Sequence, residues 1–65
     1  MNRYVLEAWI EYSMIFYMEF RSITSVAKAI DKFCSSEDYK IWFEVYDVFK
    51  DRSVNVKELM KIWHS

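Results

Sequence analysis

The first twenty residues are mostly apolar or aromatic, with one narrow polar stripe. Arg3, Glu7 and Glu11 recur at a spacing of four, which places them on one face of an α-helix. Most of the other side chains in this stretch are apolar or small. The pattern predicts a helix over residues 3–20 that neighbouring elements cover on most of its circumference.

Two shorter segments have the pattern of capped helices. Thr24 is a suitable N-cap for a helix over residues 24–34, because its hydroxyl can accept from the free amides of the first turn. Asn55 and Glu58 form a capping-box-like pair and predict a helix over residues 55–64. The inward-facing residues would be Val26, Ala29, Ile30 and Phe33 in the former and Val56, Leu59, Met60 and Trp63 in the latter.

The clearest amphipathic pattern lies between residues 36 and 50. Polar side chains step by three and four residues through Glu37, Lys40, Glu44, Asp47 and Asp51. Apolar side chains step in the same way through Tyr39, Trp42, Tyr46 and Phe49. This periodicity predicts a helix over residues 36–50 with an acidic stripe towards solvent.

Composition supports a helical reading of these patterns. The 65 residues include no glycine and no proline, but 5 Phe, 5 Tyr and 3 Trp. Because glycine supplies the positive φ angles of tight turns and proline interrupts helices, their absence favours long helices with short links. We therefore expect one all-α domain, residues 1–65, built as a compact bundle of four helices at 3–20, 24–34, 36–50 and 55–64.

Charge and cysteine content narrow the possible partners and location. The net charge is −1, so a general attraction to nucleic acid or to anionic membranes is not expected. The longest apolar run, Tyr12 to Met18, is much shorter than the roughly 20 residues of a membrane-spanning helix. The single cysteine, Cys34, excludes an intramolecular disulfide and favours a reducing, cytoplasmic location, with Cys34 as a small buried residue.

Residue types that enzymes need are sparse. The sequence has no glycine-rich phosphate loop and no paired cysteines at metal-ligand spacing. The only histidine, His64, is one residue from the C-terminus. We therefore expect no enzymatic activity, no cofactor and no metal site.

The aromatic content is the best indicator of function. Trp and Tyr are enriched at binding hot spots, and a domain this small has little interior in which to bury them. We expect a non-catalytic protein-binding module, such as an inhibitor, adaptor or regulatory subunit, whose partner is another protein or a second copy in a homodimer. The candidate contact residues are Trp9, Tyr17, Trp42 and Trp63, with Glu37, Glu44, Asp47 and Asp51 facing a basic partner.

A short internal repeat suggests a duplicated unit. The run Arg21–Thr24 and the run Arg52–Asn55 match at an offset of 31 residues, as RSIT and RSVN. Two helix–turn–helix units in tandem would explain this match.

The second of these units resembles an EF-hand. The residues that fit the family's loop are Asp47, Asp51, Val54, Asn55 and Glu58. The chain departs from the family at Phe49, which replaces an oxygen ligand, and at Arg52, which replaces the turn glycine. The resemblance implies a degenerate, metal-free module, similar to a light chain, that binds a partner helix in an apolar groove.

A third hypothesis is a DNA-binding regulator. The predicted helices 24–34 and 36–50 have the element order of a helix-turn-helix. A recognition helix presents Arg, Lys, Asn or Gln to base edges, whereas the exposed stripe here is mainly acidic. Nucleic acid is therefore the less favoured partner.

Overall fold

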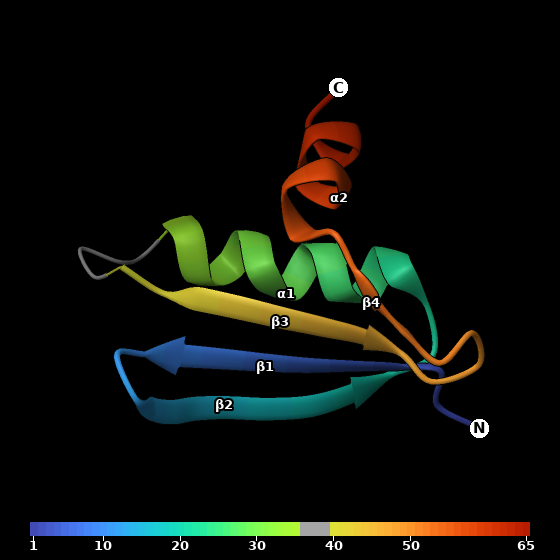
Figure 1. Cartoon of the computed structure of the whole chain (residues 1–65). Helices are drawn as coiled ribbons and strands as arrows, with labels where there is room; N and C mark the ends of the chain where they lie inside the picture. Colours follow the sequence, from blue (N-terminus) through green and yellow to red (C-terminus); the bar gives the residue numbers. More distant parts are fainter. Residues whose placement is uncertain (36–39) are drawn as a thin grey trace.

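The computed structural model describes residues 1–35 and 40–65, apart from the side chains of Cys34 and Ser35. The predicted burial of Cys34 and the predicted contact residue Glu37 therefore lie outside the described part. The elements, shown in Figure 1, are β1 (Tyr4–Ile10), β2 (Ser13–Phe20), α1 (Ile23–Ser35), β3 (Trp42–Asp47), β4 (Arg52–Val54) and α2 (Val56–Trp63).

The four strands form one antiparallel sheet in the order β2-β1-β3-β4. Each hairpin is followed by a helix, so the chain runs strand–strand–helix twice. Successive residues of a strand point to opposite sides of a sheet, and in β1 Leu6 and Ala8 point to the buried side. Helix α1 lies along this side, and α2 projects beyond it (Figure 1).

The core lies between the sheet and the helices. Leu6 of β1, Val45 of β3, and Val26 and Ile30 of α1 are fully buried against one another. Each such side chain stabilises the fold by about 1.5–3 kcal/mol relative to an exposed one. Residues of α2 extend the same cluster, so both helices cover the same face of the sheet.

An aromatic contact supports this core near the end of α1. The ring of Phe33 lies edge-on to Phe16 of β2, with 5.1 Å between ring centroids, and 5.8 Å from Phe43 of β3. Phe33 thereby joins α1 to two strands of the sheet.

The prediction of an all-α bundle is wrong, and its largest error is the helix over 3–20. These residues form the β1–β2 hairpin. A spacing of four is an even number, so Glu7 and Glu11 would share a face of a strand as well as a face of a helix. The polar stripe therefore fits the period of a helix and that of a strand equally well. In the structure, buried Leu6 and Ala8 alternate with less buried neighbours, which is the pattern of a strand.

The absence of glycine did not prevent tight turns. Glu11, between β1 and β2, has a φ of 54°, and Asp51, before β4, has a φ of 52°. These are left-handed conformations that glycine usually supplies and that strain other residues by about 1–2 kcal/mol. The inference from composition to helices failed because this chain places acidic residues at those two turns.

The helix predicted over 36–50 is also wrong where the structure describes it, because residues 42–47 form strand β3. The second helix of the helix-turn-helix hypothesis is therefore absent from the described residues 40–50. Neither of the helices in the described ranges is long and apolar enough to cross a membrane.

The other two predicted helices are confirmed. Helix α1 matches the prediction at 24–34, although Ser22 rather than Thr24 caps it, through a 3.2 Å bond from the amide of Ser25. Helix α2 matches the prediction at 55–64, and its N-cap Asn55 accepts from the amide of Glu58 at 3.0 Å, as expected.

Replacing Glu11 by glycine tests whether residues 3–20 form the observed hairpin or the helix that the sequence suggested, because the two predict opposite effects on stability. In a helix, Glu11→Gly would cost roughly 1 kcal/mol. In the hairpin turn it relieves the strain of positive φ, so we expect a higher urea midpoint, by up to about 1 kcal/mol in the free energy of unfolding.

The control for this substitution is Glu11→Ala, which keeps a Cβ atom and does not relieve the strain. A turn at this position predicts that alanine is less stable than glycine. An alanine variant more stable than the glycine variant would contradict the hairpin.

Candidate functional site

The sheet face opposite the helices is not covered by any described element. We call it the open face. Alternation and strand register assign to it Val5, Glu7 and Trp9 of β1, Met14, Tyr17 and Glu19 of β2, Trp42, Glu44 and Tyr46 of β3, and Ser53 of β4.

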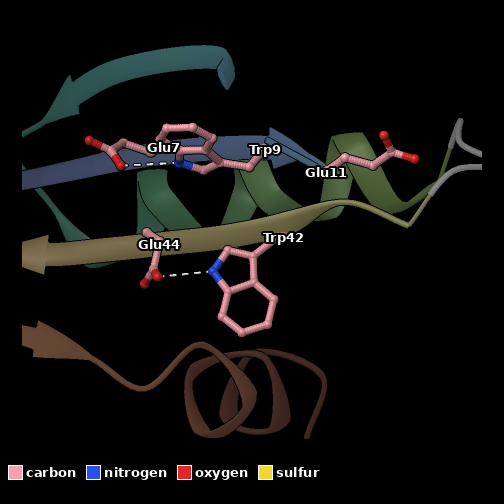
Figure 2. Close-up of a pocket in the computed structure, with 5 residues that line it drawn as sticks. All are labelled: Glu7, Trp9, Glu11, Trp42 and Glu44. Atoms are coloured by element: carbon pink, nitrogen blue, oxygen red, sulfur yellow. Dashed lines mark hydrogen bonds between the residues drawn. The ribbon is translucent and has the colours of Figure 1, made fainter. Parts of the chain in front are cut away.

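Two tryptophan–glutamate pairs occupy the centre of the open face. In the β1–β3 register, Trp9 is opposite Trp42 and Glu7 is opposite Glu44. The Trp9 Nε1–H donates to Glu7 Oε1 at 3.1 Å, and the Trp42 Nε1–H donates to Glu44 Oε1 at 2.9 Å. Figure 2 shows the two indoles turned away from each other, with α1 behind the strands. Each carboxylate is thereby fixed beside an aromatic ring.

Two hollows lie on the open face and share the two glutamates. The first, of about 310 Å³, is lined by Glu7, Trp9, Glu11, Trp42 and Glu44 (Figure 2). The second, of about 480 Å³, is lined by Val5, Glu7, Tyr17, Glu44, Val45, Tyr46 and Ser53. No basic residue of the described chain lines either hollow, so both are acidic and aromatic.

Glu7 and Glu44 form an unfavourable pair for folding. They are directly opposite on neighbouring strands, and like charges in that position destabilise a sheet. The indole N–H bonds satisfy one oxygen of each carboxylate but do not neutralise the charge. The open face therefore holds negative charge that the fold itself does not need.

Tyr17 and Tyr46 flank the glutamates with protonated phenols. The charge of nearby Glu19 raises the pKa of Tyr17, and burial and a 3.4 Å hydrogen bond to Glu19 add to this. A hydrogen bond to Asp51 raises the pKa of Tyr46. Both hydroxyls therefore stay protonated at neutral pH and act as hydrogen-bond donors rather than as nucleophiles.

The structure brings four of the eight residues predicted from sequence onto the open face. Trp9, Tyr17, Trp42 and Glu44 lie there together, although the prediction placed them on helices. Trp63 lies on α2 and is half-buried, away from this face. Glu37 is outside the described residues.

Asp47 does not face solvent as the predicted acidic stripe required. It is 4% exposed and accepts from Arg3 Nε at 3.1 Å and Arg3 Nη2 at 2.9 Å. Its Oδ1 also accepts from the amides of Phe49 and Lys50, which begins the turn before β4. The hydrogen bond from Arg3 lowers the pKa of Asp47, and the two amides lower it further against the opposing effect of burial. Asp47 thus joins the start of β1 to the end of β3.

Asp51 lies in the turn before β4 and accepts from the Tyr46 hydroxyl. Asp47, Asp51 and Asn55 therefore have structural partners, and the EF-hand resemblance stays a prediction.

Within residues 1–35 and 40–65, no three carboxylate, histidine or cysteine side chains are grouped as metal ligands would be. The one described histidine, His64, lies 3.3 Å from Asp31 and ties α2 to α1.

The sequence analysis missed Glu7, Glu19 and Tyr46 as members of the site. The signal that would have found two of them is alternation: Glu7 precedes Trp9 by two residues, and Tyr46 follows Glu44 by two. Period-two spacing places such residues on one face of a strand. Glu19 had no signal of its own, because its place depends on the register of β2 with β1.

No protein-family model, curated protein or solved structure matches this chain. The site must therefore be understood from its own residues.

The pairing of Arg3 with Asp47 predicts a specific response to acid. Because the folded pKa of Asp47 lies below its unfolded value of about 3.9, the pair contributes fully above about pH 4. As the pH falls through the folded pKa, this contribution is lost. We expect Asp47→Asn to lower the urea midpoint most at neutral pH. The difference in urea midpoint between the native chain and this variant should disappear as the pH falls below about 4.

Asparagine keeps an oxygen for the amides of Phe49 and Lys50, so the comparison isolates the charge. The matched control is Glu58→Gln, which removes the charge of an exposed carboxylate on α2 and should leave the midpoint nearly unchanged across the same pH range. A gap between the native chain and Asp47→Asn that is constant from pH 7 to pH 2 would contradict the role of the charged pair.

Proposed function

We propose that this chain is a non-catalytic protein-binding module whose contact surface is the open face. The observation that carries the proposal is the exposure of large aromatic side chains on a sheet face that no described helix covers. Trp42 is 66% exposed and Tyr17 is 53% exposed, whereas the aliphatic side chains of Leu6 and Val45 on the opposite face of the sheet are buried.

Exposed aromatics grouped on one surface are typical of protein contacts. Single apolar residues on a surface are ordinary, but Trp9, Tyr17, Trp42 and Tyr46 lie on three adjacent strands of the same face. Trp and Tyr supply much of the binding energy at interfaces, because they offer large contact areas with few rotatable bonds. The rigid sheet fixes their positions before a partner arrives, which reduces the entropy lost on binding.

The chemistry of the open face supports binding rather than catalysis. Its ionisable groups are carboxylates and phenols, and the described residues of the face include no histidine, cysteine or lysine to act as base or nucleophile. Its two hollows adjoin each other on an extended surface, which suits the side chains of another protein.

The open face does not favour the predicted homodimer. Two copies placed face to face would bring Glu7, Glu44 and Glu19 of both chains into one desolvated interface, at a large electrostatic cost. A homodimer through another surface stays a prediction. The single cysteine, Cys34, further supports a reducing, intracellular location for the complex.

A photo-crosslinker at Ser53 tests this proposal, because Ser53 lies at the exposed edge of the open face. We expect p-benzoylphenylalanine at this position to capture a discrete partner in extract of the source cells. The same group at Lys28, on the exposed side of α1, should not capture it. The Trp42→Ala change should reduce capture by about tenfold or more, as for a binding hot spot.

The matched control is Ile62→Ala. Ile62 on α2 is also 66% exposed and lies outside the open face, so its removal should leave capture unchanged. Equal capture from Ser53 and Lys28, or capture that Trp42→Ala does not reduce, would contradict binding through the open face.

A further inference from the structure

We infer that the open face binds an arginine-bearing segment of its protein partner, with guanidinium groups that pair with Glu7 and Glu44 and stack on the neighbouring indoles. This inference rests on the proposed function and adds the chemistry of the partner. It follows from four features: the unbalanced charge of the face, its fixed pairs of ring and carboxylate, the two adjoining hollows, and the way this protein holds one of its own arginines.

The first feature is charge complementarity. Glu7, Glu11 and Glu44 line the first hollow, and no basic residue of the described chain lines either hollow. The register of the sheet keeps Glu7 and Glu44 directly opposite in spite of their repulsion. A cation from a partner would relieve this repulsion on binding. An anionic or neutral segment would leave it in place.

The second feature is the geometry of each tryptophan–glutamate pair. The indole N–H bond to the carboxylate positions the ring and the charge together before a ligand binds. A cation within about 6 Å of an indole face gains from the ring quadrupole while it pairs with the carboxylate. Since one oxygen of each carboxylate accepts from an indole, the remaining lone pairs are available to a donor from a partner.

The third feature is the arrangement of the two hollows. They lie on either side of the shared Glu7 and Glu44 and are lined by indoles in one and by phenols in the other. An extended segment running along β1 and β3 would place one side chain in each hollow, with both near the glutamates. The volumes of about 310 and 480 Å³ are at the small end of ligand pockets and suit single long side chains.

The fourth feature is the binding of Arg3 within the same protein. Its guanidinium donates two bonds to the carboxylate of Asp47 and lies 5.1 Å from the ring centroid of Tyr4 and 5.5 Å from that of Phe49. The open face presents the same combination of carboxylates and aromatic rings, with no basic side chain among its described residues. Arg3 shows that the combination holds a guanidinium in this fold.

Arginine suits these features better than lysine. Its planar guanidinium stacks on an aromatic ring and donates several hydrogen bonds in its own plane, so it can engage an indole and a carboxylate together. The ammonium of lysine is a compact, strongly hydrated charge that gains less from a ring at an exposed site. The inference therefore distinguishes the two residues and not only their charge.

The test is isothermal titration of the whole chain with four capped peptides of equal length. Their alternate positions carry arginine, lysine, citrulline or glutamate, with serine between them. We expect the arginine peptide to bind, the lysine peptide to bind at least several-fold more weakly, and the citrulline and glutamate peptides not to bind. Binding of the arginine peptide should weaken with salt, because the contacts are exposed ion pairs.

Variants assign the binding to the open face. Glutamine at Glu44 or Glu7 can still accept from the neighbouring indole, so the ring keeps its place and only the charge is lost. We expect Glu44→Gln to weaken the arginine peptide by about tenfold, the effect of one charged hydrogen bond. The matched control is Glu58→Gln, which makes the same change of net charge on the exposed side of α2 and should have no effect.

A second variant tests the ring. Trp42→Leu keeps an apolar side chain at an exposed position, so folding should survive, but it removes the aromatic face. We expect a loss of the preference for arginine over lysine. Equal binding of the arginine and lysine peptides to the native chain, no binding of the arginine peptide, or equal effects of Glu44→Gln and Glu58→Gln would overturn the inference.

These outcomes are separate from those of the proposed function. If the crosslinker at Ser53 captures a partner in a Trp42-dependent manner but the arginine peptide does not bind, the open face is an interface and the inference about arginine is wrong. If neither occurs, both proposals are wrong.

Discussion

The structure depends on one constraint: α1 and α2 pack on the same face of a four-stranded sheet. Leu6 and Val45 on the two central strands are sealed by Val26 and Ile30 of α1, and this cluster holds the hairpins together. Both helices of the described residues lie on that side of the sheet. Because side chains alternate along a strand, the residues on either side of each core residue point to the uncovered face of the sheet.

The proposed function rests on the composition of the uncovered side. A face that only had to meet water would carry mixed charges and small polar groups, which raise solubility and avoid association. The open face instead carries two indoles, two phenols and three carboxylates on adjacent strands. The cross-strand pairing of Glu7 with Glu44 runs against stability, and such departures from local rules are expected at functional sites. By contrast, Arg3 and Asp47 form a salt bridge that joins the ends of the same two strands, so their charges are balanced within the fold.

Sequence reasoning identified the two helices and the cap at Asn55, because a 3.6-residue period and capping chemistry are local signals. It misassigned the strands because polar residues four apart, as at Glu7 and Glu11, fit both periods. The turns at Glu11 and Asp51 adopt positive φ without glycine, which no composition rule predicts. Trp9, Tyr17, Trp42 and Glu44 were chosen for size or charge, but their meeting on one face follows from strand register, which is a non-local property. Asp47 was assigned to solvent because its partner Arg3 is 44 residues away.

The most direct test of the central claim is a NOESY spectrum of the free chain in solution. We expect backbone contacts that place Glu7 opposite Glu44 and Trp9 opposite Trp42, together with side-chain contacts from Leu6 to Val26 and Ile30. The indole protons of Trp9 and Trp42 should show contacts to neighbours on the open face and none to α1. Sequential helical contacts through residues 3–20, or contacts from both indoles to α1, would contradict a sheet with one face open to a partner.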